Sequence, residues 1–342
     1  MIDTLQLYVQ HGEFSVSDRH KVTVQPASMI QGESGELEPE NEWPLFNNVM
    51  GAYAKHEGDR FNVNINANGL LVNYSVPKLL TGSNVYSVGH GGLVSSLSII
   101  SERLHGVGIE TDILKASISR IDCFRNIETD RSFIDYVPVF RHAHAKRQQL
   151  REYGTTFLWY NRQWQACVYD KWRQETDAGR DMPAGIKGNL IRIEIRDLNG
   201  KKVRSSLPVG KAVDLLDRDR YNRVKLAYAR RVTSVLFRQP PENLNDITTA
   251  DIESGIDMGD TEREMFENLF AMTFEQVGGT EEKLREGLRQ SFKKRYPNEN
   301  TVNVKVNRFM KRYREARHKV FFSETKNRDL YTELYDKFKA AV

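Results

Sequence analysis

Two periods of apolar residues alternate along the N-terminal part of the chain and predict its elements. A period of two, typical of half-buried strands, begins in MIDTLQLYV (1–9) and returns in FNVNINANGLLVNYSV (61–76). The second segment carries Asn68-Gly69 between two strand-like halves, and this dipeptide is a strong hairpin signal. We therefore expect antiparallel sheet in this region.

The next segments alternate between helical and strand patterns. GLVSSLSIISERLHGVG (92–108) has apolar residues at helical spacing and ends at glycines, so it predicts a helix. KASISRIDCF (115–124) is typical of a strand. RSFIDYVPVFRHAHAKRQQLREYG (131–154) is expected to be mostly helical, with Pro138 near its start or at a kink.

Two further strand regions follow before a basic helix. TTFLWYNRQWQACVYDKW (155–172) predicts a hairpin, and NLIRIEIRDL (189–198) predicts a strand after a glycine-rich loop. DRDRYNRVKLAYARRVTSVLFR (217–238) predicts a helix that leads to Pro240-Pro241. This proline pair is the best candidate for a domain boundary.

Beyond the prolines the charge balance shifts twice. Residues 241–280 hold ten acidic side chains against a single arginine, whereas residues 281–322 hold thirteen Lys or Arg against five acids. The basic block predicts two helices separated near Pro297. The second helix places its apolar residues on one stripe: Val302, Val306, Phe309, Tyr313, Ala316 and Val320.

These patterns predict an α+β protein in two parts. Residues 1–238 form an antiparallel sheet flanked by helices, and residues 242–342 form a helical, charge-segregated domain. The sequence has no apolar run long enough for a transmembrane helix, and its opening lacks the pattern of a signal peptide, so we expect a cytoplasmic protein. Cys123 and Cys167 lack metal-ligand spacing, which argues against a disulfide framework or a zinc site.

Candidate chemistry lies on three of the predicted strands. Because side chains alternate across a strand, LIRIEIR separates a face of isoleucines from a face of charged residues. If the three strands are neighbours, two carboxylates, a phenol and a lysine converge on one polar surface amid arginines. The residues on these faces are Arg192, Glu194 and Arg196; Arg120 and Asp122; and Gln165, Cys167, Tyr169 and Lys171.

This surface suits phosphate chemistry. Asp122 and Glu194 offer hard oxygen ligands for Mg²⁺ or Mn²⁺, and a metal held by two carboxylates keeps positions open for a phosphodiester oxygen. Tyr169 is a weak nucleophile unless positive charge, from Lys171 or the metal, favours its phenolate. The alternatives are simpler, because a strand tyrosine is most often a packed aromatic and Arg-Glu-Arg alternation is most often a solvated face.

The motifs SISRIDCF, VYDK and LIRIEIR, in this order, resemble those of the filamentous-phage gene II-type replication endonucleases and the related trans-acting plasmid rolling-circle initiators. MIDTL and KLLTGSNVYS (78–87) are also similar to the phage proteins, and the resemblance covers roughly residues 1–215. It implies that Tyr169 is the DNA-nicking nucleophile, assisted by Lys171, and that Asp122 and Glu194 are metal ligands.

Three other features compete for a functional role. His142-Ala-His144 resembles the His-hydrophobe-His metal motif of other rolling-circle nickases, but a helical setting would point the two rings apart and favours a solvated basic face. Tyr160 is the second candidate nucleophile, with packing or base stacking as its alternative. SVGHGG (87–92) lacks the lysine and spacing of a P-loop, so a tight turn before the helix is preferred.

The charge pattern identifies candidate DNA contacts. The basic helices of the second part can follow a phosphate backbone, or they can simply balance the acidic segment before them. The candidates are Arg120, Arg192 and Arg196 beside the predicted site, and Lys293, Lys294, Arg308, Lys311 and Arg312 in the basic block.

The resemblance implies a function in rolling-circle replication of a phage or plasmid. The protein would nick one strand of duplex origin DNA, stay attached to the 5′ phosphate, and later rejoin the displaced single strand. A host helicase and DNA polymerase are the implied partners, and the sequence leaves open whether a homodimer is required. The alternatives are a mobilisation relaxase or transposition nickase with the same chemistry, and a non-catalytic origin-binding protein.

Overall fold

The computed structural model divides the chain into two compact units, which are described separately. It describes residues 1–17, 61–66, 69–180, 188–237, 281–323 and 325–341, together with Met182, residues 185–186, Ala271 and four short strands within 25–50. Unit 1 comprises Met1–Phe133, Ala145–Val235 and Lys337–Val342, and unit 2 comprises Ile134–His144 and Leu236–Asp336. The expected boundary at Pro240-Pro241 and most of the acidic segment lie outside the described residues.

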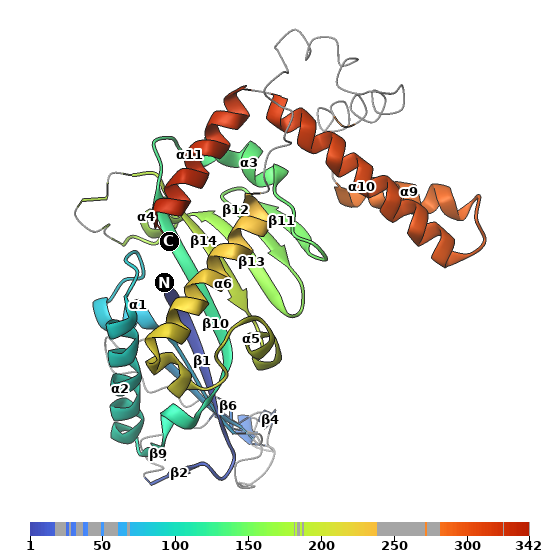
Figure 1. The fold of residues 1–342 in the computed structure, drawn as a ribbon. Coiled ribbons are helices and arrows are strands. Elements are labelled where there is room, and N and C mark those ends of the chain that lie inside the picture. The colour runs from blue at the N-terminus through green and yellow to red at the C-terminus, as the bar shows by residue number, and fades with distance from the viewer. Residues whose placement is uncertain are drawn as a thin grey trace. The chain divides into compact units, whose positions relative to one another are not determined.

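An eight-stranded antiparallel sheet forms the centre of unit 1, in the order β11-β12-β13-β14-β10-β1-β8-β7 (Figure 1). Its strands are β1 (Ile2–Gln10), β7 (Phe61–Asn66), β8 (Gly69–Ser75), β10 (Ser117–Glu128), β11 (Gln149–Tyr153), β12 (Thr156–Tyr160), β13 (Trp164–Asp170) and β14 (Leu190–Asp197). Three small pairs lie outside this sheet: β2 (Phe14–Val16) with β9 (Ile109–Thr111), β3 (Gln25–Pro26) with β6 (Val49–Met50), and β4 (Met29–Gln31) with β5 (Leu37–Pro39).

Two long helices cover the apolar face of this sheet. α2 packs beside β8, where Tyr74 and Ser96 bring their hydroxyl oxygens within 3.5 Å, and α6 packs over β14, where the hydroxyl of Tyr228 donates to the carbonyl of Ile193 over 2.9 Å. The opposite face of the sheet carries the polar residues. Among the residues described, this unit contains the helices α1 (Val76–Thr81), α2 (His90–Gly106), α4 (Lys171–Asp177), α5 (Gly200–Ser206) and α6 (Arg218–Leu236), and 3₁₀ turns at Ile113–Lys115 and Ala212–Leu216.

The predicted N-terminal hairpin is confirmed as β7 and β8. Gly69 is the first residue of β8 and pairs with Asn66. It therefore belongs to the strand, and is not one of the two central residues of the turn. Its φ of +152° and a carbonyl oxygen of Val9 only 2.2 Å from where a Cβ would stand both require glycine. This glycine therefore lets β8 approach β1.

The α+β fold expected from the sequence is confirmed, but one local prediction is wrong and two helices were not predicted individually. Residues 131–154 are not mostly helical: α3 (Val137–His142) has Pro138 in its first turn and ends early, and β11 follows. β11 is exposed throughout, so it lacks the apolar alternation of a half-buried strand and exists through pairing with β12. α4 and α11 (Thr325–Ala341) are helices that the sequence analysis did not identify.

Unit 2 contains the two predicted basic helices, α9 (Glu281–Lys293) and α10 (Glu299–Ser323), and also α3. The expected apolar stripe of α10 is confirmed for Val302, Val306, Tyr313 and Ala316, which are buried together with Leu284 of α9. Arg314 donates two hydrogen bonds to Oε2 of Glu281, at 2.9 and 2.7 Å, and so ties the two helices together. None of the helices described in either unit combines the length and the apolar character needed to cross a membrane.

Candidate active site on the polar face of the sheet

The three strands that carry the predicted site are neighbours, in the order β13-β14-β10. Tyr169 pairs with Arg192, and Cys167 pairs with Glu194. On the other side of β14, Arg196 pairs with Asp122. Paired residues share a face, so the structure brings together the phenol and both carboxylates that the alternation predicted.

Tyr169 and Glu194 are in direct contact. The phenol donates a 2.8 Å hydrogen bond to Oε1 of Glu194, and both residues are buried, with Tyr169 only 7% exposed. Burial, and then the negative charge of Glu194, raise the pKa of Tyr169 well above its ordinary value. The tyrosine is therefore protonated in this state and has a carboxylate beside it to accept its proton.

Two arginines hold Glu194 in its charged form. Arg196 donates to Oε2 through Nε over 2.8 Å and through a second, shorter bond, and Arg192 reaches Oε1 over 3.4 Å. Burial acts against the charge, but Arg196 and then Arg192 outweigh it, and the pKa of Glu194 is lowered. The Arg196 side chain remains 27% exposed, so this guanidinium connects the buried carboxylate to the surface.

Asp122 lies on the same face but has its own partner. Arg120, two residues earlier on β10, donates to both carboxylate oxygens over 2.9 and 2.7 Å. Burial raises the pKa of Asp122 to about 6, although Arg120 opposes the change. The Arg120 side chain is 32% exposed, so the predicted DNA contacts Arg120 and Arg196 both keep access to solvent.

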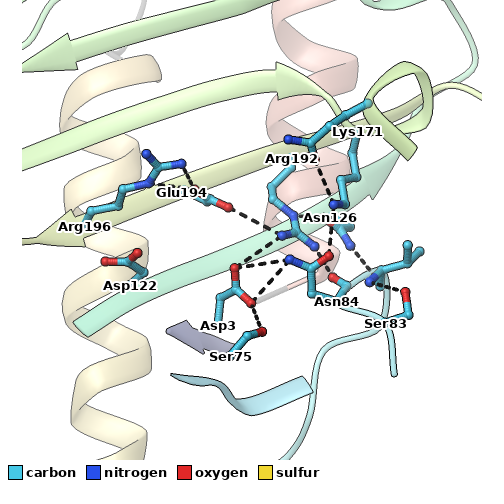
Figure 2. A network of polar contacts seen from close by, with 12 residues as sticks. Asp3, Ser75, Ser83, Asn84, Asp122, Asn126, Lys171, Arg192, Glu194 and Arg196 are labelled. Atoms are coloured by element: carbon cyan, nitrogen blue, oxygen red, sulfur yellow. Dashed lines mark hydrogen bonds and ion pairs between the residues drawn. The ribbon is translucent and has the colours of Figure 1, made fainter. Parts of the chain in front are cut away.

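Arg192 is the centre of a buried network (Figure 2). Its guanidinium is fully buried over the ring of Phe124, donates to Asn126 and to the backbone carbonyl of Asn84, and reaches Asp3 over 3.5 Å. The prediction that Arg192 contacts DNA is therefore corrected. With its donors engaged inside the sheet, Arg192 positions Glu194 rather than meeting a phosphate.

Lys171 also differs from its prediction. It does not continue β13 beside Tyr169, because Asp170 caps α4 by accepting from the backbone N–H of Arg173 over 2.9 Å, and Lys171 is the first residue of that helix. The Lys171 ammonium donates to Asn84 over 3.0 Å and forms an ion pair with Glu175. It is 1% exposed, and burial followed by the charge of Arg192 lowers its pKa to about 8.

Asp3 and Asn84 also belong to the site, although their sequence pattern did not predict this. Asp3 accepts from Ser75 over 2.8 Å and from the Asn84 amide over 3.4 Å, and both reach Arg192. The alternation of β1 places Asp3 with the apolar residues Leu5 and Leu7, but a register shift between Ile2 and Thr4 turns it to the polar face. The one signal in the sequence was that Asp3 lies in MIDTL and Asn84 in KLLTGSNVYS, the two segments that are similar to the phage proteins.

The two predicted metal ligands do not fit a divalent cation as they are arranged. Every carboxylate oxygen of Asp122 and Glu194 already accepts from arginine or tyrosine, and the guanidinium groups of Arg120 and Arg196 would repel a cation. Within the described part of the chain, no three His, Cys, Asp or Glu side chains are grouped as a metal site. The role of Mg²⁺ or Mn²⁺ stays a prediction.

The competing features resolve differently. His142 is not on a solvated helix face: its ring stacks on Phe321 at 4.0 Å, and its Nε2 lies 2.6 Å from Nδ1 of His318, all within unit 2. SVGHGG leads directly into α2, whose first residue is His90, which agrees with the preferred interpretation as a turn before the helix. Tyr160 is the last residue of β12; it lies on the polar face of the sheet and pairs with Gln165 of β13.

Most of the predicted DNA contacts of the basic block are at the surface of unit 2. Lys293, Lys294, Arg308 and Lys311 are exposed, and Arg312 is half-buried. By contrast, Arg314 forms an ion pair with Glu281 inside the unit.

In comparisons with known proteins, no family model matches the chain and no curated protein matches it.

Proposed function

We propose that this chain is a rolling-circle replication initiator that nicks and rejoins DNA through Tyr169. The observation that carries the proposal is the 2.8 Å hydrogen bond from the Tyr169 phenol to Glu194, on the face where the three motif strands meet. A nucleophile with an adjacent base and a nearby, partly exposed cation is the arrangement that phosphoryl transfer needs. Arg196 supplies the cation.

The proposed step transfers one phosphate bond. The Tyr169 oxygen bonds to phosphorus as the bond from phosphorus to the 3′ oxygen breaks, and Glu194 takes the phenolic proton. The departing 3′ oxygen takes a proton from a water molecule, and the hydroxide that remains is neutralised by the proton that Glu194 then releases. The product is a 5′-phosphotyrosyl strand with a free 3′ hydroxyl. Reversal of the same step rejoins the strand.

Arrival of the phosphate would also activate the base. Arg196 lowers the pKa of Glu194, so a phosphate that draws this guanidinium away leaves Glu194 a stronger base. Because Tyr169 is 7% exposed, the phosphate reaches the phenol only after its surroundings open. Substrate binding and activation of the tyrosine are thus a single event in this proposal.

The proposed function implies the same partners as the sequence resemblance. They are double-stranded origin DNA, the displaced single strand, and a host helicase and DNA polymerase, in the host cytoplasm. The burial and raised pKa of Tyr169 favour one second candidate, an origin-binding protein that keeps the sheet without the reaction.

The test compares two tyrosine variants on supercoiled DNA of the replicon that encodes the chain. Tyr169→Phe should abolish open-circle product and the denaturant-resistant protein–DNA adduct, whereas Tyr160→Phe, the matched control on the same face, should keep both. Peptide mapping should place the nucleotide on Tyr169. The assay is run with Mg²⁺, with Mn²⁺ and with a chelator.

Each outcome decides between the candidates. Nicking by Tyr169→Phe would overturn the assignment of the nucleophile. If the wild-type protein binds the DNA but never nicks it under any of these conditions, the origin-binding protein is the correct description. Circular dichroism of both variants checks the fold, since loss of one hydrogen bond costs only about 1 kcal/mol.

A further inference from the structure

The polar face of the sheet continues beyond the site to the edge strand β11. Tyr160 pairs with Gln149 on one side and with Gln165 on the other, and Gln165 pairs with Arg196. These four residues form a row across four strands, so Tyr160 and Arg196 are two strand spacings apart, about 10 Å. All four are exposed or half-buried.

Arg151 and two tyrosines line the outer end of this row. The Arg151 guanidinium lies over the Tyr160 ring, 4.6 Å from its centre, and its Nη1 reaches the hydroxyl of Tyr153 over 3.4 Å. Tyr153 is 53% exposed, and the whole of β11 is exposed. One face of the Tyr160 ring is thus already covered by a planar cationic group.

The charge of this edge identifies its occupant. Residues 145–165 hold four basic side chains against Glu152 alone. Exposed aromatic rings beside basic groups suit single-stranded DNA, whose bases stack on rings and whose phosphates pair with arginine. Base pairs in a duplex are already stacked on each other, and an apolar partner would gain little from a charged edge.

We propose that Arg151, Tyr153 and Tyr160 form a binding edge for single-stranded DNA that guides the strand along the row to Arg196. A base stacks on Tyr160 or on the Arg151 guanidinium above it, and Arg151 and Arg196 take successive parts of the backbone. The direction of this path rests on the proposed function, since Arg196 leads to Glu194 and Tyr169. Binding of the strand to the edge does not depend on the chemistry.

The experiment measures binding of a fluorescent 15-nucleotide oligo-dT by anisotropy, in a Tyr169→Phe background that forms no adduct. Tyr160→Leu should weaken binding about tenfold because stacking is lost, whereas Tyr160→Phe should stay within about twofold. Arg151→Gln should weaken binding and make the slope of log affinity against log salt shallower by about 0.7. The matched control is Arg173→Gln, an exposed arginine on α4 outside this row, which should change neither quantity.

Several outcomes would overturn the proposal. These are unchanged binding in both Tyr160→Leu and Arg151→Gln, an equal loss in Arg173→Gln, an equal loss on a 15-base-pair duplex, or a change of oligomeric state in the edge variants that accounts for the effect. Arg151→Gln alters an exposed side chain, so it keeps the test valid if Tyr160→Leu misfolds. A wild-type protein that makes no adduct would refute the proposed function alone, while intact nicking with unchanged oligo-dT binding would refute this inference alone.

Discussion

The phenol of Tyr169 and the carboxylate of Glu194 form a 2.8 Å hydrogen bond between side chains that lie 25 residues apart in the chain. Adjacent strands bring them together, and Arg192 and Arg196 fix the carboxylate from its other sides. These contacts account for the protonation state of each of the two groups. Burial and Glu194 keep the proton on Tyr169, and the arginines keep Glu194 ionised.

Glu194→Gln should reduce formation of the covalent adduct by about 10²- to 10⁴-fold, because the amide cannot accept the phenolic proton. The rate of adduct formation is measured in single turnovers on oligonucleotides that contain the nick site. Binding of oligo-dT is the control that the polar face of the sheet remains intact. If Glu194 were instead a metal ligand, raising the Mn²⁺ concentration would restore part of the rate. Recovery of this kind would contradict the role of general base.

Arg192→Met should lower the free energy of unfolding by about 3–5 kcal/mol, since it leaves Glu194 and Asp3 buried without the guanidinium between them. Urea denaturation followed by circular dichroism gives the value. Arg173→Met is the matched control, because that side chain is 63% exposed and should change stability by no more than about 0.5 kcal/mol. Equal stabilities for the two variants would show that the network around Arg192 does not hold the site together.

Glu175 should make stability dependent on pH in the acid range. Burial opposes its charge, but hydrogen bonds from Arg180 and Lys171 lower the pKa of Glu175 from 4.5 to about 2. A carboxyl with a depressed folded-state pKa stabilises the protein fully above pH 4.5, and this contribution is lost as the pH falls toward 2. Its size at neutral pH is roughly 3 kcal/mol.

The measurement compares Glu175→Gln with the wild-type protein across this range. The variant should be less stable at pH 7, and the difference should shrink as the pH falls from 4.5 toward 2. Asp177→Asn on the same helix is the control, because that carboxylate is 68% exposed and should show little difference at either pH. A stability difference that does not vary with pH would contradict the assigned ion pairs.

The exposed basic residues of unit 2 should contribute to binding of duplex DNA. Replacing Lys293, Lys294, Arg308 and Lys311 with Gln should weaken binding and make the salt slope shallower by about 0.9 for each phosphate contact removed. Arg314→Gln is the contrasting variant, since it removes the bidentate partner of Glu281 and should lower Tm instead. An unchanged slope in the fourfold variant would assign these residues to solubility alone. Point variants are preferable to deletion of 242–342, because residues 337–342 belong to unit 1.

Local pattern was sufficient to predict most strands and the faces of their side chains. In β14 the period of two separated Ile193 and Ile195 from Arg192 and Glu194 correctly, because alternation is a property of the extended backbone. The capping aspartate at Asp170 was an available signal for α4 that the strand interpretation overlooked. β11 offered no such signal, since its exposed polar residues form a strand only by pairing with β12.

The sequence by itself determined which residues share a face within each strand, and the resemblance of three short motifs directed attention to Tyr169. Tertiary structure alone decided that β13, β14 and β10 are neighbours, that a register shift turns Asp3 toward Arg192, and that Arg192 is fully buried. The physical reason is distance along the chain. Strand pairing, burial and the pKa changes that follow from them depend on contacts between distant segments, such as Asp3 and Arg192, 189 residues apart, which no local period encodes.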